Sequence, residues 1–136
     1  MARVLLADDN PTSRLTLQTV LEAGGYSVDS AASAAEAVGL MDQSEYELVL
    51  SDLSMESPEA GYQVIEHARM MAYRPATALV TSWQGTHEKQ GTLDPKHAQS
   101  SEVLIAPEDL PELLGQVAML IGTRASRRAT RSARHL

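Results

Sequence analysis

Two short apolar runs that end in acid decide the fold: Val4-Leu5-Leu6-Ala7-Asp8-Asp9 and Leu48-Val49-Leu50-Ser51-Asp52. A short apolar run without polar alternation is typical of a strand buried on both faces, as in a parallel sheet. The carboxyl ends of such strands form the edge where open α/β sheets bind their ligands. Carboxylates gathered at one edge repel each other, so the pattern predicts a bound cation, with Mg²⁺ as the expected ion.

Strands and helices alternate along the rest of the chain. The predicted strands are Arg3–Ala7, Tyr26–Ser30, Glu47–Ser51, Ala76–Thr81 and Glu102–Ala106. The predicted helices are Pro11–Ala23, a segment that begins near Ser33, Gly61–Met71, and a segment that begins at Pro107. This alternation predicts an α/β fold, a doubly wound five-stranded parallel sheet. Because residues 84–102 contain almost no apolar side chains, the fourth helix is expected to be degraded or replaced by a loop.

The 136 residues suffice for one hydrophobic core, which is predicted to lie within residues 1–121. The remaining segment, 122–136, carries five arginines and no acid, and is expected either to extend the last helix or to be disordered. Without it the chain has six basic and eighteen acidic residues, a formal charge of −12, so nucleic acid is not an expected partner. There is no cysteine and no apolar stretch of membrane-spanning length, which predicts a cytoplasmic protein without membrane contact.

Thr81 ends a third apolar strand and adds a hydroxyl to the edge where Asp8, Asp9 and Asp52 are expected to meet. With these residues the chain resembles the receiver domains of two-component response regulators, which have a flavodoxin-like fold. The resemblance implies that Asp52 accepts a phosphoryl group from a histidine kinase or a phosphotransfer protein. It also implies that Thr81 is the switch hydroxyl and that Mg²⁺ is held by Asp8, Asp9, Asp52 and the backbone carbonyl of Ser54.

Three features depart from the family pattern. Ala106 replaces the lysine that receiver domains carry before a proline at the end of strand five, so an ammonium partner for the phosphoryl group is missing. Val103 stands where the family has its switch aromatic. The loop after Asp52 is one residue longer than usual and contains Glu56, which is expected either to face water or to lie close to the acidic site.

Two functions therefore stay open. The first is a stand-alone, atypical receiver in a phosphorelay, which is not an enzyme and whose output is contact with a downstream protein. A homodimer through strand five and the last helix is a further option for this reading. The second function is a pseudo-receiver that binds partners without phosphorylation. A small Mg²⁺-dependent phosphatase is disfavoured, because such enzymes need a general acid two residues after the aspartyl nucleophile, where this chain has Ser54.

Overall fold

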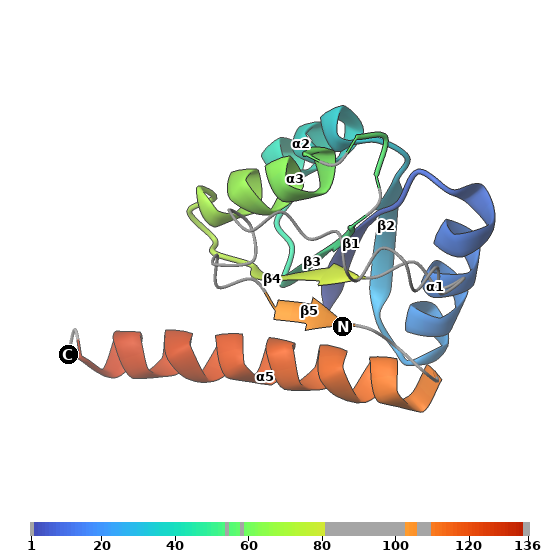
Figure 1. Ribbon diagram of the computed structural model, residues 1–136. Coiled ribbons are helices and arrows are strands. Elements are labelled where there is room, and N and C mark those ends of the chain that lie inside the picture. The colour runs from blue at the N-terminus through green and yellow to red at the C-terminus, as the bar shows by residue number, and fades with distance from the viewer. Residues whose placement is uncertain (1, 54, 58, 81–102, 106–109, 135–136) are drawn as a thin grey trace.

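The computed structural model describes residues 2–53, 55–57, 59–80, 103–105 and 110–134, with side chains left out of the description in 103–105, 110 and 128–134. The strands are β1 (Arg3–Ala7), β2 (Ser27–Ala31), β3 (Leu48–Asp52), β4 (Ala76–Val80) and β5 (Val103–Ile105). The helices are α1 (Pro11–Ala23), α2 (Ala34–Gln43), α3 (Ala60–Arg69) and α5 (Leu110–Arg134) (Figure 1). The stretch in which a degraded fourth helix is expected lies outside the described residues.

All strands of the sheet run parallel, in the order β2-β1-β3-β4-β5. The α/β class and the parallel sheet predicted from the sequence are thus confirmed. β1 and α1 have the predicted bounds, whereas β2 and β3 are each displaced by one residue toward the C-terminus. Helix α3 ends at Arg69 rather than at Met71, because the amide of Met71 donates to the carbonyl of Ala68 in a tighter turn.

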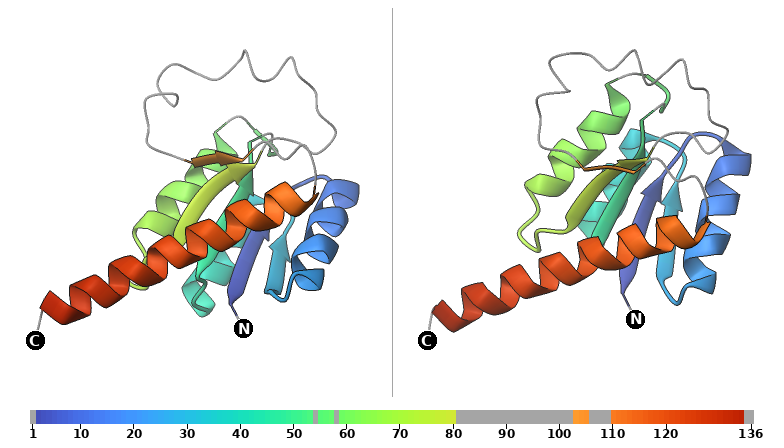
Figure 2. Two further views of the ribbon diagram at one scale, coloured as in Figure 1. Left: turned by 90° about the horizontal axis from the view of Figure 1, so that it is seen from below. Right: turned by 60° about the horizontal axis from the view of Figure 1, so that its bottom comes forward.

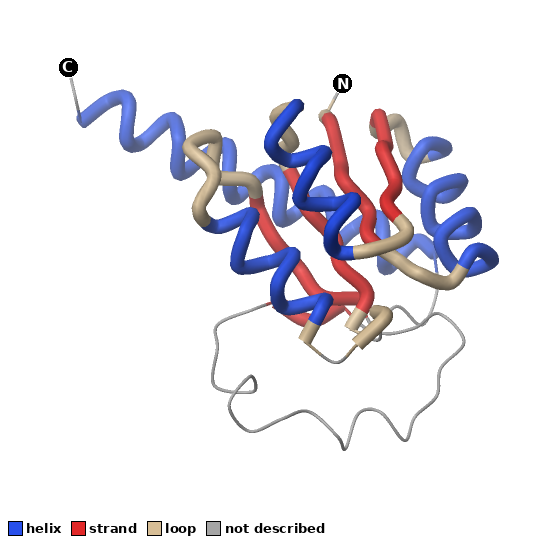
Figure 3. The backbone as a smooth tube through the Cα atoms, turned by 90° about the horizontal axis from the view of Figure 1, so that it is seen from above, coloured by secondary structure: helices blue, strands red, loops and turns tan. Residues whose placement is uncertain are grey.

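Alternate side chains of β1 to β4 point to opposite faces of the sheet, and apolar side chains form a core on each face. The core between the sheet and helices α1 and α5 consists of Val4, Leu6, Leu17, Leu21, Val28, Leu48, Leu50, Ala78, Val80, Leu113 and Val117. The core under α2 and α3 consists of Leu5, Ala7, Ala31, Ala34, Ala37, Met41, Tyr46, Val49, Met55, Ala60, Val64 and Ala68. Figures 2 and 3 show the resulting three layers, with α1 and α5 on one face of the sheet and α2 and α3 on the other.

The first helix begins and ends at residues suited to those positions. Asn10 is the N-cap of α1, and its side-chain oxygen accepts a hydrogen bond from the amide of Ser13 at 3.0 Å. Pro11 occupies the first turn, where its missing N–H costs nothing. After the helix, Gly25 adopts a φ of 98°, a left-handed conformation that glycine reaches without strain. The caps that the sequence predicts therefore position α1 directly after the acids of β1.

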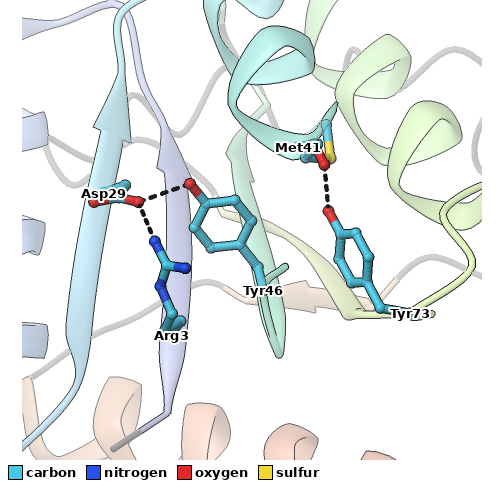
Figure 4. A network of polar contacts seen from close by, with 5 residues as sticks. All are labelled: Arg3, Asp29, Met41, Tyr46 and Tyr73. Carbon is cyan, nitrogen blue, oxygen red and sulfur yellow. Dashed lines mark hydrogen bonds and ion pairs between the residues drawn. The ribbon is translucent and has the colours of Figure 1, made fainter. Parts of the chain in front are cut away.

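A polar network away from these acids joins the start of β1, the middle of the edge strand β2 and the residue two positions before β3 (Figure 4). One carboxylate oxygen of Asp29 accepts from the guanidinium of Arg3 at 3.0 Å and from the buried phenol of Tyr46 at 2.7 Å. The guanidinium carbon of Arg3 also lies 5.1 Å from the ring centroid of Tyr46. Burial, together with the hydrogen bond and charge of Asp29, raises the pKa of Tyr46 above its ordinary value of 10.0. We call Arg3, Asp29 and Tyr46 the Asp29 network.

Helix α5 continues without interruption to Arg134, so residues 122–134 extend the last helix. At the point where α5 leaves the sheet, the guanidinium of Arg124 donates to the carbonyls of Tyr73 and Arg74 at 2.8 and 3.0 Å. These bonds attach the helix to the turn between α3 and β4. Within the described residues, no helix combines the length and the apolar character that a membrane crossing requires.

Candidate functional site

Three carboxylates meet at the carboxyl edge of the sheet. β1 and β3 are neighbours, with Ala7 paired with Ser51, so the acids that follow them are brought together. One oxygen atom from each of Asp8, Asp9 and Asp52 lies within 4.8 Å of the others. We call these residues the acid cluster; among the described residues they form the one group of three acids or histidines that could hold a metal ion. The prediction that the three acids meet is thus confirmed.

The members of the acid cluster differ in their access to water. Asp8 and Asp52 are buried, with 1% and 6% of their surface exposed, whereas Asp9 is exposed. Oδ1 of Asp8 accepts from the amide of Asn10 at 2.9 Å, but the buried Oδ2 has no hydrogen-bond partner among the described residues. A buried carboxylate oxygen without a donor is costly, more so beside two further carboxylates. A divalent cation bound by these oxygens would relieve both costs, so the residues present fit Mg²⁺.

Backbone contacts hold Asp8 in place. Its amide donates to the carbonyl of Ala31 at 3.0 Å, which extends the pairing of β1 and β2 by one residue. Its own carbonyl accepts from the guanidinium of Arg14, on the second turn of α1, at 2.9 Å. Because Asp8 is fixed through its main chain on both sides, its carboxylate is oriented before any ligand arrives, as a preorganised site requires.

Asp52 is held by an unusually close approach of α3. A Cβ atom added to Gly61 would lie 2.6 Å from the carbonyl oxygen of Asp52, closer than any side chain tolerates. Only glycine therefore allows the first turn of α3 to pack on the end of β3. On the other side, the amide of Leu53 donates to the carbonyl of Val80 at 2.9 Å, which ties the residue after Asp52 to β4.

Glu56 has a definite role that the sequence does not reveal. Its side chain is exposed, as one of the two expectations has it, yet both carboxylate oxygens accept from the amide of Ala34 at 3.3 Å. Ala34 is the first residue of α2, where backbone amides lack partners within the helix. The Glu56 carboxylate therefore attaches the loop after β3 to the amino end of α2, where a negative charge is favourable.

The remaining predicted residues cannot be placed. Ser54 and Thr81 lie outside the described residues, as do Ala106 and the side chain of Val103. Their proposed roles stay predictions. Sequence reasoning missed the role of Gly61, and for Glu56, which it did name, it missed the bond to α2. Gly61 carries a signal, because the family pattern has a glycine in this loop, whereas the bond from Glu56 to α2 leaves no local pattern in the sequence.

The fold and the acid cluster define a class of signalling domain, and comparison with known proteins agrees. The sequence profile of the response regulator receiver domain matches residues 4–117. The chain belongs to this family.

Individual relatives support the assignment. The chain is 31% identical over 126 residues to the protein PilH of Pseudomonas aeruginosa, an alignment that covers 90% of this chain and 100% of PilH. It is 29% identical over 89 residues to the sensor protein EvgS of Escherichia coli, where the alignment covers 65% of this chain but only 7% of EvgS. A solved structure of the Thermotoga maritima response regulator TrrA in complex with Mg²⁺-BeF is 27% identical, with a TM-score of 0.70 over 88% of this chain and 99% of that one.

Proposed function

We propose that this receiver domain accepts a phosphoryl group on Asp52, with Mg²⁺ held by the acid cluster and by the backbone carbonyl of Ser54. The observation that carries the proposal is the buried, unpartnered Oδ2 of Asp8 beside the carboxylates of Asp9 and Asp52. The Mg²⁺-BeF complex of the similar protein TrrA supports the same reading. Thr81 is proposed as the switch hydroxyl.

The residues of the chain have separable tasks in this reaction. A carboxylate oxygen of Asp52 forms a bond to phosphorus while the bond from phosphorus to the histidine nitrogen of the donor breaks, and the imidazole keeps the electron pair. Bound Mg²⁺ would supply positive charge that offsets the repulsion between the carboxylate and the phosphoryl oxygens. Asp8, fixed through Asn10 and Arg14, would contribute a preoriented oxygen to the ion. Gly61 and the bond from Leu53 to Val80 keep Asp52 at the end of β3.

The partners follow from the chemistry of the donor. We propose that a histidine kinase or a phosphotransfer protein supplies the phosphoryl group and that a downstream protein reads the phosphorylated state. In this proposal the receiver acts in the cytoplasm and has no enzymatic activity of its own. It acts without an attached output domain, which the match over the full length of PilH supports.

Intact mass spectrometry tests the proposal directly. The protein is incubated with acetyl phosphate and Mg²⁺, and a phosphoryl mass shift is expected that disappears in Asp52→Ala and in the presence of a chelator. Asp42→Ala is the matched control, because Asp42 is an exposed aspartate on α2 away from the acid cluster. A shift of equal size in Asp52→Ala would contradict the assignment of Asp52. Thr81→Ala is expected to keep the mass shift but to weaken the response of the downstream partner.

The pseudo-receiver is the second candidate, favoured by one observation. Ala106 offers no ammonium group for the phosphoryl oxygens. If this reading holds, no mass shift forms with acetyl phosphate or with a phosphorylated donor protein, although Mg²⁺ still binds and raises the melting temperature. Ala106→Lys then separates the two candidates: it is expected to accelerate phosphorylation if Asp52 is an acceptor, and to change nothing in a pseudo-receiver.

A further inference from the structure

Helix α5 packs on the body of the molecule through its first turns and through Arg124. Leu113 and Val117, on the first half, are buried against the sheet. Arg124 makes the last described contact, with the turn between α3 and β4. Figures 1 and 2 show that α5 then projects past the α/β body over its remaining turns. From Arg124 to Arg134 the helix extends by about 15 Å, at 1.5 Å for each residue.

The projecting segment carries its charge on one side. Its arginines occupy positions 124, 127, 128, 131 and 134, which recur at helical spacing and fall within one third of the helix circumference. This side continues the line of positions 113, 117 and 120 that packs on the body in the first half. The other positions of 122–134 hold only glycine, alanine, serine and threonine. We call the side that holds the five positions the arginine face.

The opposite layer of the molecule has the opposite charge. Residues 34–68, which run from the start of α2 to the last residue but one of α3, contain eight acids and no lysine or arginine. Exposed acids of this layer are Glu36, Asp42, Glu45, Glu56, Glu59 and Glu66. His67 contacts Asp42 at 2.9 Å, and Arg69 at the end of α3 is the first arginine after this stretch. We call the outer surface of α2, α3 and the adjoining loops the acidic layer.

We propose that the arginine face of α5 binds the acidic layer of a second copy of this chain. The two surfaces complement each other in charge, and within one molecule α5 lies on the opposite side of the sheet from α2 and α3 (Figure 3). Contact between the arginine faces of two copies is excluded, because it would place like charges against each other. The association is therefore head to tail, helix against acidic layer.

Other occupants fit less well. A membrane surface requires large apolar residues beside the cations, and 122–134 contains none. A nucleic acid would approach a body with a formal charge of −12, and the segment offers no aromatic side chain for base stacking. The acidic layer presents carboxylates, which arginine binds in a planar, two-bonded geometry. The association needs no phosphorylation of Asp52, so it stands apart from the proposed function.

Sedimentation velocity of the full chain tests the proposal. At low salt, we expect association that increases with protein concentration. In 0.5 M NaCl the dissociation constant should rise by about tenfold or more, because added ions screen exposed charges. Arg127→Glu/Arg131→Glu should remain monomeric at every concentration. Lys89→Glu/Lys96→Glu changes the net charge equally but alters no residue by which either surface is defined, and should associate like the native protein. Circular dichroism establishes that each variant keeps its helical content.

Reversal of both surfaces gives the sharpest result. Glu45→Arg/Glu66→Arg, which reverses two exposed acids of the acidic layer, should also remain monomeric alone. Mixed with Arg127→Glu/Arg131→Glu, it should form a heterodimer, because a basic layer then meets an acidic helix. A monomer at low salt and high concentration would overturn the proposal. So would association that nuclease treatment abolishes, which would indicate nucleic acid as the ligand, or association that both reversed variants retain.

Discussion

The acid cluster and the Asp29 network differ in how the charge of their carboxylates is compensated. In the network, one oxygen of Asp29 receives both a guanidinium and a phenol, so its charge is balanced within the protein. In the acid cluster, Oδ2 of Asp8 is buried without a partner among the described residues and lies beside two further carboxylates. The first arrangement stabilises the fold and leaves nothing to bind. The second destabilises the ligand-free fold and leaves a place for a cation.

The largest effect is expected where the backbone holds the acid cluster together. Gly61→Ala would force a methyl group against the carbonyl of Asp52, so the free energy of unfolding should fall by about 3 kcal/mol. Urea denaturation measures this change. Gly39→Ala is the matched control, since a Cβ there meets nothing within 4 Å and alanine favours a helix interior by about 0.5–1 kcal/mol. Equal effects of the two substitutions would show that the close approach of α3 is unimportant.

The next largest loss of stability is expected when the Asp29 network is broken. Tyr46→Phe removes a buried hydroxyl that donates to a charged carboxylate, so a loss of about 2 kcal/mol is expected. Tyr73→Phe removes a bond to a neutral acceptor, the carbonyl of Met41, and should cost about 1 kcal/mol. Thermal or urea unfolding of both variants in the same buffer gives the difference. If Tyr46→Phe lost less stability than Tyr73→Phe, the bond to the Asp29 carboxylate would not be a major stabilising contact of the fold.

Neutralising one member of the acid cluster should change the free energy of unfolding less, and should raise it rather than lower it. Asp8→Asn keeps the acceptor for the amide of Asn10 and removes a buried negative charge. In the presence of a chelator the variant should be more stable than the native protein by about 1 kcal/mol. In saturating Mg²⁺ the order should reverse, because only the native protein gains stability from the ion. Lower stability of the variant in both conditions would mean that the cluster carries no electrostatic cost.

The smallest effect concerns pH. Burial raises the pKa of Tyr46 and of Tyr73, reinforced at Tyr46 by Asp29 and at Tyr73 by the charges of Asp42 and Glu45. Below pH 10 both phenols are protonated in the folded and unfolded chains, so their contribution is fully present. Above pH 10 the unfolded chain loses these protons first, and stability should fall as the pH rises toward the folded pKa values. Urea titrations at pH 8 and near pH 11 measure the fall, which should shrink in Tyr46→Phe.

Much of the site follows from the sequence because its residues sit at the ends of strands. The position of Asp8 after β1 and of Asp52 at the end of β3 predicts their meeting, since parallel strands share one carboxyl edge. Local signals also position the helices: Asn10 and Pro11 predict the start of α1, and Ser33 predicts the start of α2. Such features depend on neighbours in the chain, which a single sequence displays.

The features that escaped prediction depend on contacts between distant segments. The bond from Glu56 to the amide of Ala34 spans 22 residues, and that from Tyr46 to Asp29 spans 17. Arg124 reaches a turn 50 residues earlier, although by composition it belongs to a solvated basic tail. No periodicity or spacing encodes these partners, because either member could serve equally well as an exposed polar residue.

The single unbroken helix α5 also has a mechanical consequence. Its first turns pack on the sheet, and Arg124 is hydrogen-bonded to the turn between α3 and β4. That arginine is therefore the last described point at which the helix is attached to the body. Beyond Arg124 the helix is about 15 Å long, so a tilt of α5 by about 10° about that arginine would move its C-terminal end by about 2.5 Å. A tilt of the turns that pack on the sheet would thus be transmitted to the far end of the helix.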